Sequence, residues 1–512
     1  MVFAACAQDL SRTVTIIVQM PPNFYLQFGG ISFFSVIFRH QCYNKKNWQS
    51  RSPKGQAAII TLNTGRRINM TTNMTEGRII PQLTEFTIPL VLGNLFQLTY
   101  NAADSVIVGK FVGDEALAAV GTAGPIMNMV ILFISGMCMG AGILMSTHYG
   151  AKDYDLLRRQ ISTSMLGGLG FSAVVAILLI LFAHPLLELL QVPADIIESA
   201  KIYLRIIFVG LIFTFVYNFF SNTLRALGDS KVPLYFLIIS AFLNVVGDLF
   251  FVLVLEWGVP GSAVATVLSE ALCCLFCLIY IKKKVPLLSL GKKWRVFDAS
   301  LLLRTFNYGI TSALQQMCVQ LGKICVQTVV NVQGVAFIAA FTAINRVDDF
   351  AMTPQQNIAH AATTFMAQNR GAGKIDRMKK GVLSSIILQV IYTTVIAILV
   401  FFGSRPIMQL FVSDGSEEVI SLGVSYLQLI AFMYFMPSAT NIIQGYFRGL
   451  GDLKVTLIST ILNMSSRFLA AWLMIHVMHG GFECLAWANF AGWIAMLAFQ
   501  IPMIATRWKK VK

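Results

Sequence analysis

The sequence predicts an all-α polytopic membrane protein with twelve transmembrane helices in two six-helix lobes. Of its 512 residues, 56% are hydrophobic and only 12% are charged, which is about half the charged share of a soluble domain. Mean hydropathy is +0.69, and apolar runs such as 234–251 and 386–402 are long enough to cross a bilayer as helices. A sequence motif that occurs twice adds the two-lobed organisation.

Hydrophobic segments from residue 81 onward are interpreted as spans. They lie near 82–104, 116–142, 160–184, 200–224, 232–255, 259–281, 303–329, 334–366, 381–403, 420–446, 455–476 and 484–506. An even number of spans in each half gives both halves the same orientation. We therefore expect a pseudo-two-fold axis along the membrane normal, a cleft between the lobes, and transport by alternating access.

The internal repeat is clearest in one loop. Arg225–Val232 (RALGDSKV) returns 223 residues later as Arg448–Val455 (RGLGDLKV), with six of eight positions identical. A second pair, Met145–Ala151 and Met366–Ala372, is spaced by 221 residues. We expect the two copies of the first motif to serve as turns and topology anchors.

The net charge of +15 is interpreted as a topological signal rather than as nucleic-acid binding. Lys and Arg concentrate in the loops after the even-numbered spans, for example at Lys282–Lys284, whereas acids such as Glu417 and Glu418 dominate the opposite loops. The positive-inside rule then places both termini in the cytoplasm. We expect a multi-pass protein of the plasma membrane that has the lipid bilayer as a partner and is functional as a monomer.

The sequence shows no constellation of an enzyme or an ATPase. It contains no GxxxxGK[ST] loop, so transport is expected to use an ion gradient or to be passive. Cys273, Cys274 and Cys277 have a spacing that could hold a metal, but no matching Cys/His pair accompanies them, and small apolar core residues are the preferred interpretation. No cofactor is expected other than a coupling H⁺ or Na⁺.

The expected organisation has five parts. They are an atypical extension (1–79), an N-lobe with spans 1–6 (80–284), a cytoplasmic linker (285–300), a C-lobe with spans 7–12 (301–507) and a basic tail (508–512). The start of the chain is rich in Lys and Arg and has no segment long enough to span. It is interpreted as disordered, or as upstream of a working start at Met70 or Met74; an ordered cytoplasmic domain is the alternative.

Charged residues inside spans are candidates for function, because a charge at the bilayer centre costs at least ~2.5–3.5 kcal/mol. Asp104 ends the apolar part of the first span and would be buried, and able to exchange a proton, if that helix continues through Gly109. Asn244 and Asp248 share one helix face, and Thr266 in the next span could face them. These oxygen ligands suit Na⁺ or a proton relay; an interhelical hydrogen-bond clamp is the alternative.

Six other charges in the spans are candidates for cargo binding or for structural pairing. They are Glu270, Lys323, Arg346, Asp348, Asp349 and Arg467. Arg346 and Asp349 are expected to neutralise each other in part, and Lys323 to pair with Asp348 or Asp349.

Separate expectations apply to Glu270, Arg467 and His360. Glu270 could attract a cationic cargo or form a structural pair. Arg467 stands where the first half has Asn244, so the halves have diverged where the coupling chemistry is expected. His360, on an apolar span, is interpreted as a satisfied core histidine.

Several motifs, in their order and spacing, resemble the MATE (multidrug and toxic compound extrusion) family of cation-coupled antiporters. They are Ile88-Pro89, Asn101–Gly109 (NAADSVIVG), Ala118–Gly121 (AAVG), Gly150-Ala151, Arg225–Asp229 (RALGD), Leu243–Asp248 (LNVVGD) and Gly258–Thr266 (GVPGSAVAT). The resemblance runs from about residue 80 to the C-terminus. It implies a V-shaped twelve-helix fold that exports organic cations, drugs or other amphipathic compounds in exchange for Na⁺ or H⁺.

The resemblance also implies site residues. Prokaryotic members hold their N-lobe cation with a first-span aspartate, a fifth-span Asn/Asp pair and a sixth-span threonine, which match Asp104, Asn244, Asp248 and Thr266 here. Some members also carry C-lobe acids in the seventh and tenth spans. Spans 303–329 and 420–446 contain no acid in this sequence, so coupling is expected in the N-lobe.

Two other functions fit the same composition. A flippase for lipid-linked saccharides would need a cleft rich in Arg and Lys, for which the spans offer Lys323, Arg346 and Arg467 as candidates. A non-transporting receptor or scaffold would show no gradient-dependent flux. The sequence alone does not choose between Na⁺ and H⁺ or name the cargo.

Overall fold

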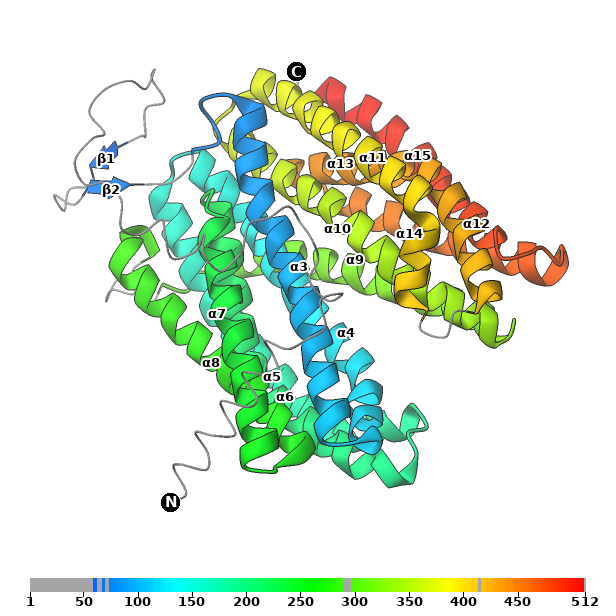
Figure 1. Cartoon of the computed structure of the whole chain (residues 1–512). Helices are drawn as coiled ribbons and strands as arrows, with labels where there is room; N and C mark the ends of the chain where they lie inside the picture. Colours follow the sequence, from blue (N-terminus) through cyan, green and yellow to red (C-terminus); the bar gives the residue numbers. More distant parts are fainter. Residues whose placement is uncertain (1–58, 62–66, 70–72, 289–295, 413–415, 511–512) are drawn as a thin grey trace, which may run out of the picture. The chain divides into compact units, whose positions relative to one another are not determined.

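The structure is a computed structural model that describes residues 59–61, 67–69, 73–288, 296–412 and 416–510; for 59–61, 67–69, 101–106, 114, 117, 286 and 508–510 it describes the backbone only. The chain divides into two compact units, Met1–Gln56 and Ala57–Lys512, and the described residues all belong to the second. The predicted helical fold class is confirmed (Figure 1). Each predicted span lies on a helix of the second unit.

The N-lobe consists of α3–α8 and the C-lobe of α9–α15. The N-lobe elements are α3 (Ile79–Phe111), α4 (Asp114–Gly150), α5 (Tyr154–Leu189), α6 (Ala194–Ala226), α7 (Lys231–Asp248) continued by the π-helix η2 (Leu249–Val254), α8 (Gly258–Lys284) and a 3₁₀ turn η3 (Pro286–Leu288). The C-lobe elements are α9 (Ala299–Asn331), α10 (Val335–Gly371), α11 (Ile375–Phe411), α12 (Glu417–Met433), α13 (Phe435–Leu450), α14 (Leu453–Trp472) continued by the π-helix η5 (Leu473–Val477), and α15 (Cys484–Lys510). Helices α12 and α13 form one span bent by 48°, so each lobe has six spans.

Among the described helices, nine are long and apolar enough to cross a membrane, or ten with the bent pair. The two that fall short are α9 and α10, which carry Lys323 and the run Arg346–Asp349 together with many amide and hydroxyl side chains. Besides the helices, strands β1 (Ile59–Thr61) and β2 (Arg67–Asn69) pair antiparallel. This hairpin is a small departure from the all-α expectation.

The repeated loop motif encodes the same helix ending twice. Gly228 and Gly451 adopt the left-handed conformation, with φ of 89° and 78°. In each copy the N–H of the next residue, Asp229 or Asp452, donates to the carbonyl five residues earlier at 2.9 Å. This is the Schellman ending of a helix, which needs a residue that tolerates positive φ. The loop is therefore a turn, as predicted.

The second repeated motif marks a helix crossing between the lobes. A Cβ atom on Gly150 of α4 would lie 1.9 Å from the carbonyl oxygen of Gln368 of α10, and one on Gly371 would lie 1.9 Å from that of Thr147. The C-terminal ends of α4 and α10 thus touch backbone to backbone, and each lobe contributes one glycine. Only a residue without a side chain permits this approach.

Packing inside the lobes follows the repeat. Helix α6 packs against α4, α5 and α8 in the N-lobe, and its counterpart, the bent pair α12–α13, packs against α10, α11 and α15 in the C-lobe. Each lobe has its own apolar core, one around Phe208 and Phe220 and the other around Tyr426 and Ile430. Between the lobes, α9 packs along α4, and α3 packs along α10.

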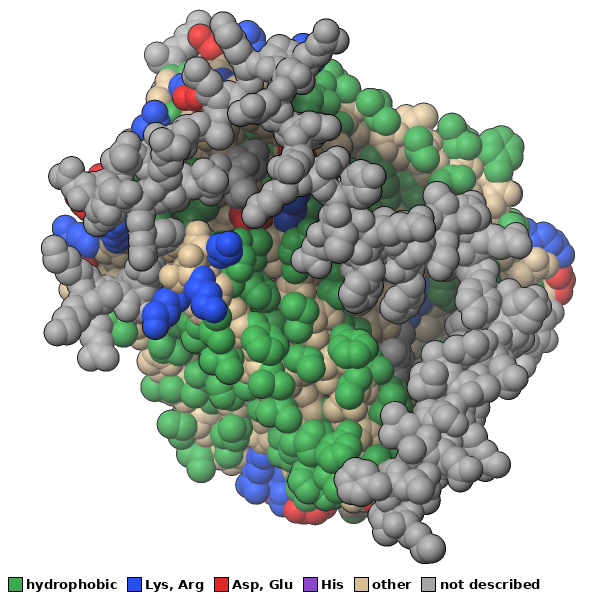
Figure 2. Space-filling view, turned by 60° about the vertical axis from the view of Figure 1, so that its left-hand side comes forward, with side chains coloured by type: hydrophobic (Ala, Val, Ile, Leu, Met, Phe, Trp, Pro, Cys, Tyr) green, Lys and Arg blue, Asp and Glu red, His purple; other side chains and the backbone are tan. Residues whose placement is uncertain are grey.

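The surface has the character expected in a bilayer. Figure 2 shows hydrophobic side chains over most of the described part of one face, with charged side chains gathered mainly toward its borders. Large apolar side chains such as Leu181, Phe242 and Phe402 are more than half exposed. Such a surface is stable next to hydrocarbon chains rather than water.

The segment that precedes α3 is firmly attached to the C-lobe. Met74 is fully buried, and the Arg377 guanidinium donates to the carbonyl oxygens of Met74, Glu76 and Gly77 at 2.7–3.1 Å. The Asn369 amide donates to the Met74 carbonyl as well. The prediction of a disordered or non-native extension over residues 1–79 is therefore too wide at its C-terminal end.

Candidate functional site

A polar cavity of about 460 Å³ lies between N-lobe helices and α10. Its wall comes from α3, α4, α6, α7 and α8, with α10 opposite and Gln316 of α9 at one side. The volume falls in the range of sites for small molecules. The cavity therefore has room for one organic guest.

Helix α6 presents a polar stripe to this cavity. Thr214, Asn218, Asn222 and Arg225 recur at intervals of three or four positions and all line the wall, as expected for one face of an α-helix. The amide groups of Asn218 and Asn222 donate to the carbonyl oxygens one turn earlier, at 2.9 and 2.8 Å. Sequence reasoning missed this stripe, although its spacing inside an apolar span was a usable signal.

Helix α10 faces the cavity with a second polar stripe. Thr353, Asn357, His360 and Thr364 line the wall at the same helical spacing, and the Asn94 amide of α3 donates to Asn357 Oδ1 at 3.3 Å. This stripe explains the low hydropathy of α10. His360 was interpreted as a core histidine; the structure instead places it in the cavity wall.

Glu270 of α8 is the only acid among the described residues that line the cavity. The Thr214 hydroxyl donates to Glu270 Oε2 at 2.5 Å, which fixes the carboxylate against the α6 stripe. Charge-assisted hydrogen bonds of this kind are short and strong. Glu270 is thus held against the α6 stripe, with its side chain in the cavity wall.

The structure brings together three of the four predicted coupling residues. The Asn244 amide of α7 donates to Thr266 Oγ1 of α8 at 3.1 Å, and both residues line the cavity. Asn244 Oδ1 is buried and accepts no hydrogen bond from the described part of the chain. Asp248 lies one turn further along α7, fully buried, where the α-helix passes into η2. An oxygen that lacks a donor beside a buried carboxylate fits a proton or a Na⁺ ion.

The fourth predicted coupling residue, Asp104, has a side chain outside the described residues. Its backbone is helical, because α3 continues through Gly109 to Phe111, which is the condition under which the sequence predicts its burial.

The register of α3 against α7 gives the level of Asp104 along the helix axis relative to Asp248. The Lys231 ammonium of α7 pairs with Glu85 of α3 at 2.6 Å, and the two helices pack side by side. Asp248 lies 17 positions beyond Lys231 and Asp104 lies 19 positions beyond Glu85. In parallel helices with a rise of 1.5 Å per residue, the two positions are level to within about 3 Å.

The C-lobe charges form pairs of their own, and none of them lines the cavity. Lys323 pairs with Asp349 at 3.0 Å, which is one of the two partners that the sequence allowed. The expected partial neutralisation of Asp349 by Arg346 is not found among the described ion pairs, because the Asp349 carboxylate turns to Lys323. Arg346 is exposed.

Asp348 is held by the aromatic hydroxyls of the tenth span. Tyr434 donates to Asp348 Oδ1 at 2.7 Å and Tyr426 to Oδ2 at 3.4 Å, while Asn489 of α15 donates to the Tyr426 oxygen at 2.7 Å. Arg467 is close enough to act electrostatically on this carboxylate. The C-lobe thus has a carboxylate network on residues that sequence reasoning did not connect.

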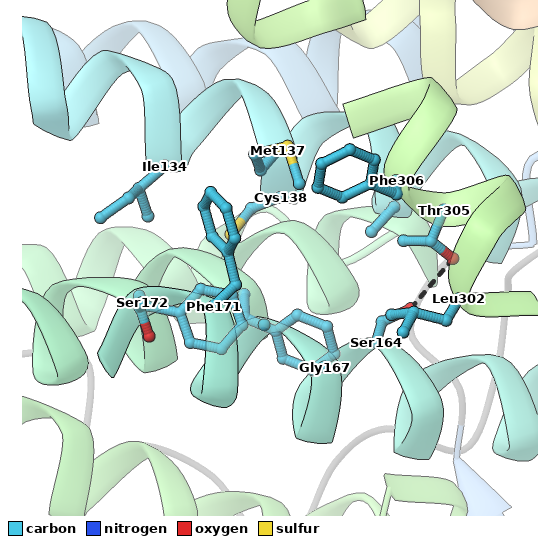
Figure 3. A pocket seen from close by; sticks show the side chains of 14 residues that line it. Ile134, Met137, Cys138, Ser164, Gly167, Phe171, Ser172, Leu302, Thr305 and Phe306 are labelled. Atoms are coloured by element: carbon cyan, nitrogen blue, oxygen red, sulfur yellow. Dashed lines mark hydrogen bonds between the residues drawn. The ribbon is translucent and has the colours of Figure 1, made fainter. Parts of the chain in front are cut away.

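A smaller cavity of about 50 Å³ lies between α4, α5 and α9. Figure 3 shows that its lining is mainly apolar, with Phe171, Phe306 and Met137 around it, while Ser164 and Thr305 approach each other at 3.4 Å. A space of this size holds one or two water molecules at most. It is a packing gap beside Gly167 rather than a site for cargo.

Two homologous six-helix lobes with a polar cavity among their membrane spans define the chain as a membrane transporter by class. Comparison with known proteins identifies the family: residues 89–250 and 311–473, one segment in each lobe, match the MatE family. The chain therefore belongs to the MATE family, and it is a multi-pass membrane protein.

Curated relatives and solved structures agree with this assignment. The chain is 29% identical over 392 residues to the probable multidrug resistance protein YpnP of Bacillus subtilis, covering 76% of this chain and 87% of that protein. It is 30% identical over 375 residues to the probable multidrug resistance protein YoeA of the same organism, covering 72% and 80%. An outward-facing multidrug resistance transporter of the MATE family shares the fold with a TM-score of 0.80 at 20% identity, covering 86% and 98%.

Proposed function

We propose that this protein exports organic cations, drugs or other amphipathic compounds across a prokaryotic plasma membrane, in exchange for H⁺ or Na⁺, with both termini in the cytoplasm. One observation carries the proposal. Thr266 of the coupling cluster and Glu270 of the cargo cavity stand one turn apart on α8, and both line the same cavity.

This arrangement supports exchange by simple electrostatics. A cation or proton on the Asn244–Asp248 cluster raises the positive potential around Glu270 and weakens the binding of a cationic guest there. Departure of the coupling ion has the opposite effect. An antiporter requires that the coupling ion and the cargo weaken each other's binding and are released on opposite sides of the membrane. Reciprocal coupling between the two sites provides this.

The contacts between the lobes support alternating access. Gln368 of α10 donates from its amide to the Ala226 carbonyl at 2.8 Å, next to the backbone contact at Gly150, so the cavity is closed at the end near Ala226. By the charge pattern of the loops, this is the cytoplasmic end. We propose that transport opens this contact and closes the opposite end.

Gradient-driven efflux from proteoliposomes tests the proposal. Wild type is loaded with a fluorescent organic cation and given an inward Na⁺ or H⁺ gradient, beside Asp104→Asn and Asp248→Asn. We expect a gradient to drive efflux in wild type and not in Asp248→Asn. Full gradient-driven efflux in both variants would rule out coupling in the N-lobe, and no flux in wild type would favour a receptor or scaffold.

The lipid-linked saccharide flippase is less well supported by the cavity. The basic residues proposed for its cleft, Lys323, Arg346 and Arg467, do not line it, and Arg225 is the one Lys or Arg among the described residues that do.

A further inference from the structure

Arg225 is the feature of the cavity that export of a simple cation does not use. This residue belongs to the repeated loop motif and was expected to act as a topology anchor, but it lines the cavity near its closed end. A positive group in a cavity for cations repels such a cargo, so its place there is unfavourable unless it binds another group.

The Arg225 guanidinium has no acidic partner in the described part of the chain. None of the described ion pairs includes it, and its Nε atom is shielded from solvent without an acceptor. A guanidinium stays protonated at any physiological pH. An unpaired buried charge is costly, and an anion bound beside it removes much of that cost.

The counterpart arginine of the second lobe has a hydrogen-bond partner inside its own lobe, although its Nε atom, like that of Arg225, lacks an acceptor among the described residues. Arg448, its counterpart 223 residues later, is 7% exposed and donates to Gln444 Oε1 at 3.1 Å. The position that matches Gln444 in the N-lobe is Ser221, whose side-chain oxygen is two atoms closer to the backbone. The N-lobe arginine therefore lacks the intramolecular acceptor that its counterpart has.

The distance between the two charged ends of the cavity is set by α6. Thr214, which binds Glu270, and Arg225 are eleven positions apart on this helix, or about 16 Å between Cα atoms. A long helical side chain leans toward the helix N-terminus, which brings the guanidinium closer, to roughly 10 Å from the carboxylate. His360, on which Arg225 acts electrostatically, lines the same cavity.

We propose that Arg225 forms an anion-binding subsite at the closed end of the cavity, so that the preferred cargo is an amphipathic zwitterion with a carboxylate at one end and a cationic group at the other. The proposal rests on the proposed export function and gives it a substrate class. Glu270 binds the cationic end, and the guanidinium of Arg225 binds the carboxylate through paired N–H donors.

Equilibrium binding of two matched dyes to the purified full-length protein in detergent tests this proposal. One dye is a rhodamine with a free benzoate, a zwitterion, and the other is its methyl ester, a cation of almost the same shape. Wild type is expected to bind the zwitterion more tightly. Arg225→Gln should weaken zwitterion binding by about tenfold or more and leave the ester bound equally or more tightly.

Three variants complete the design. Arg225→Lys, which keeps the charge but not the paired donors, should retain part of the preference. Arg346→Gln, which removes a positive charge outside the cavity, should leave the ratio of the two dissociation constants unchanged. Glu270→Gln should weaken both dyes alike. Thermal unfolding of each variant shows whether it is folded.

Equal weakening of both dyes by Arg225→Gln would overturn the subsite, as would a wild type that binds the ester only or binds neither dye. The export function fails separately, if wild type binds dye but no ion gradient drives its efflux from proteoliposomes.

Discussion

The two lobes differ most where their sequences are most closely related. Helices α6 and α13 both end in the same motif and the same Schellman turn, yet α6 turns its polar stripe to a cavity. In α13 the counterpart of Arg225, Arg448, donates to Gln444, and Gln444 donates to Thr460 of α14 at 3.0 Å. The two lobes therefore share a frame, but the arginine of the shared motif faces a cavity in the N-lobe and an amide of its own helix in the C-lobe.

The fifth and sixth spans show the same contrast. In the N-lobe, Asn244 leaves an acceptor oxygen open beside Asp248. In the C-lobe, the positions equivalent to these are Arg467 and Ala471, and the acid, Asp348, comes from a different helix and is bound by tyrosines. The π-helices η2 and η5 occupy matching places, so the π-turn belongs to the shared frame and does not by itself mark the site.

The largest loss of stability is expected at the contact between the lobes to which each contributes one glycine. Gly150→Val or Gly371→Val would place side-chain atoms against the backbone of the other lobe, at a cost of about 1–3 kcal/mol or more from overpacking. Thermal unfolding in detergent measures the loss. Gly170→Ala is the control, because a Cβ atom there meets nothing within 4 Å. Similar melting temperatures for all three variants would contradict the close contact.

The next largest effect, on the ion dependence of efflux, should distinguish the two lobes. Asn244→Ala removes the open acceptor oxygen beside Asp248, and we expect gradient-driven efflux to need about tenfold more coupling ion, the equivalent of about 1.4 kcal/mol. The measurement is efflux rate against Na⁺ and H⁺ concentration. The equivalent C-lobe change, Arg467→Ala, should leave that concentration dependence unaltered even where it lowers the amount of folded protein.

A smaller effect is expected at the C-lobe carboxylate. Asp348→Asn keeps one oxygen acceptor for Tyr434 or Tyr426 but removes the charge that faces Arg467. Stability should fall by about 1 kcal/mol, while the ion dependence of efflux stays that of wild type. A lost ion dependence in this folded variant would move the coupling site into the C-lobe.

The smallest effect is expected at the Lys323–Asp349 pair. Both side chains are 44% exposed, and ion pairs of this kind contribute about 0–1 kcal/mol. A double-mutant cycle of Lys323→Gln and Asp349→Asn on thermal stability measures the pair. A coupling energy well above that range would show that the C-lobe charges are held as firmly as those at the cavity.

Much of the frame could be predicted from the sequence. Apolar segments, repeat spacing and loop charge led to the spans and to two lobes, because hydropathy and helix length act locally. The α7–α8 cluster of Asn244, Asp248 and Thr266 was also found, since i and i+4 positions share a face and their partner lies on the next helix. The places of Arg225 and His360 in the cavity wall were not predicted, because a residue's exposure to a cavity depends on helices far away in the chain.

The sequence by itself determined that this chain is a duplicated membrane transporter with an unequal pair of halves. Only the tertiary structure decided which polar groups face the cavity and which are satisfied internally. The physical reason is that a buried hydrogen bond needs a partner at about 3 Å. Gln444 provides that partner for the Nη2 atom of Arg448, whereas Ser221, at the matching position of the N-lobe, provides none for Arg225.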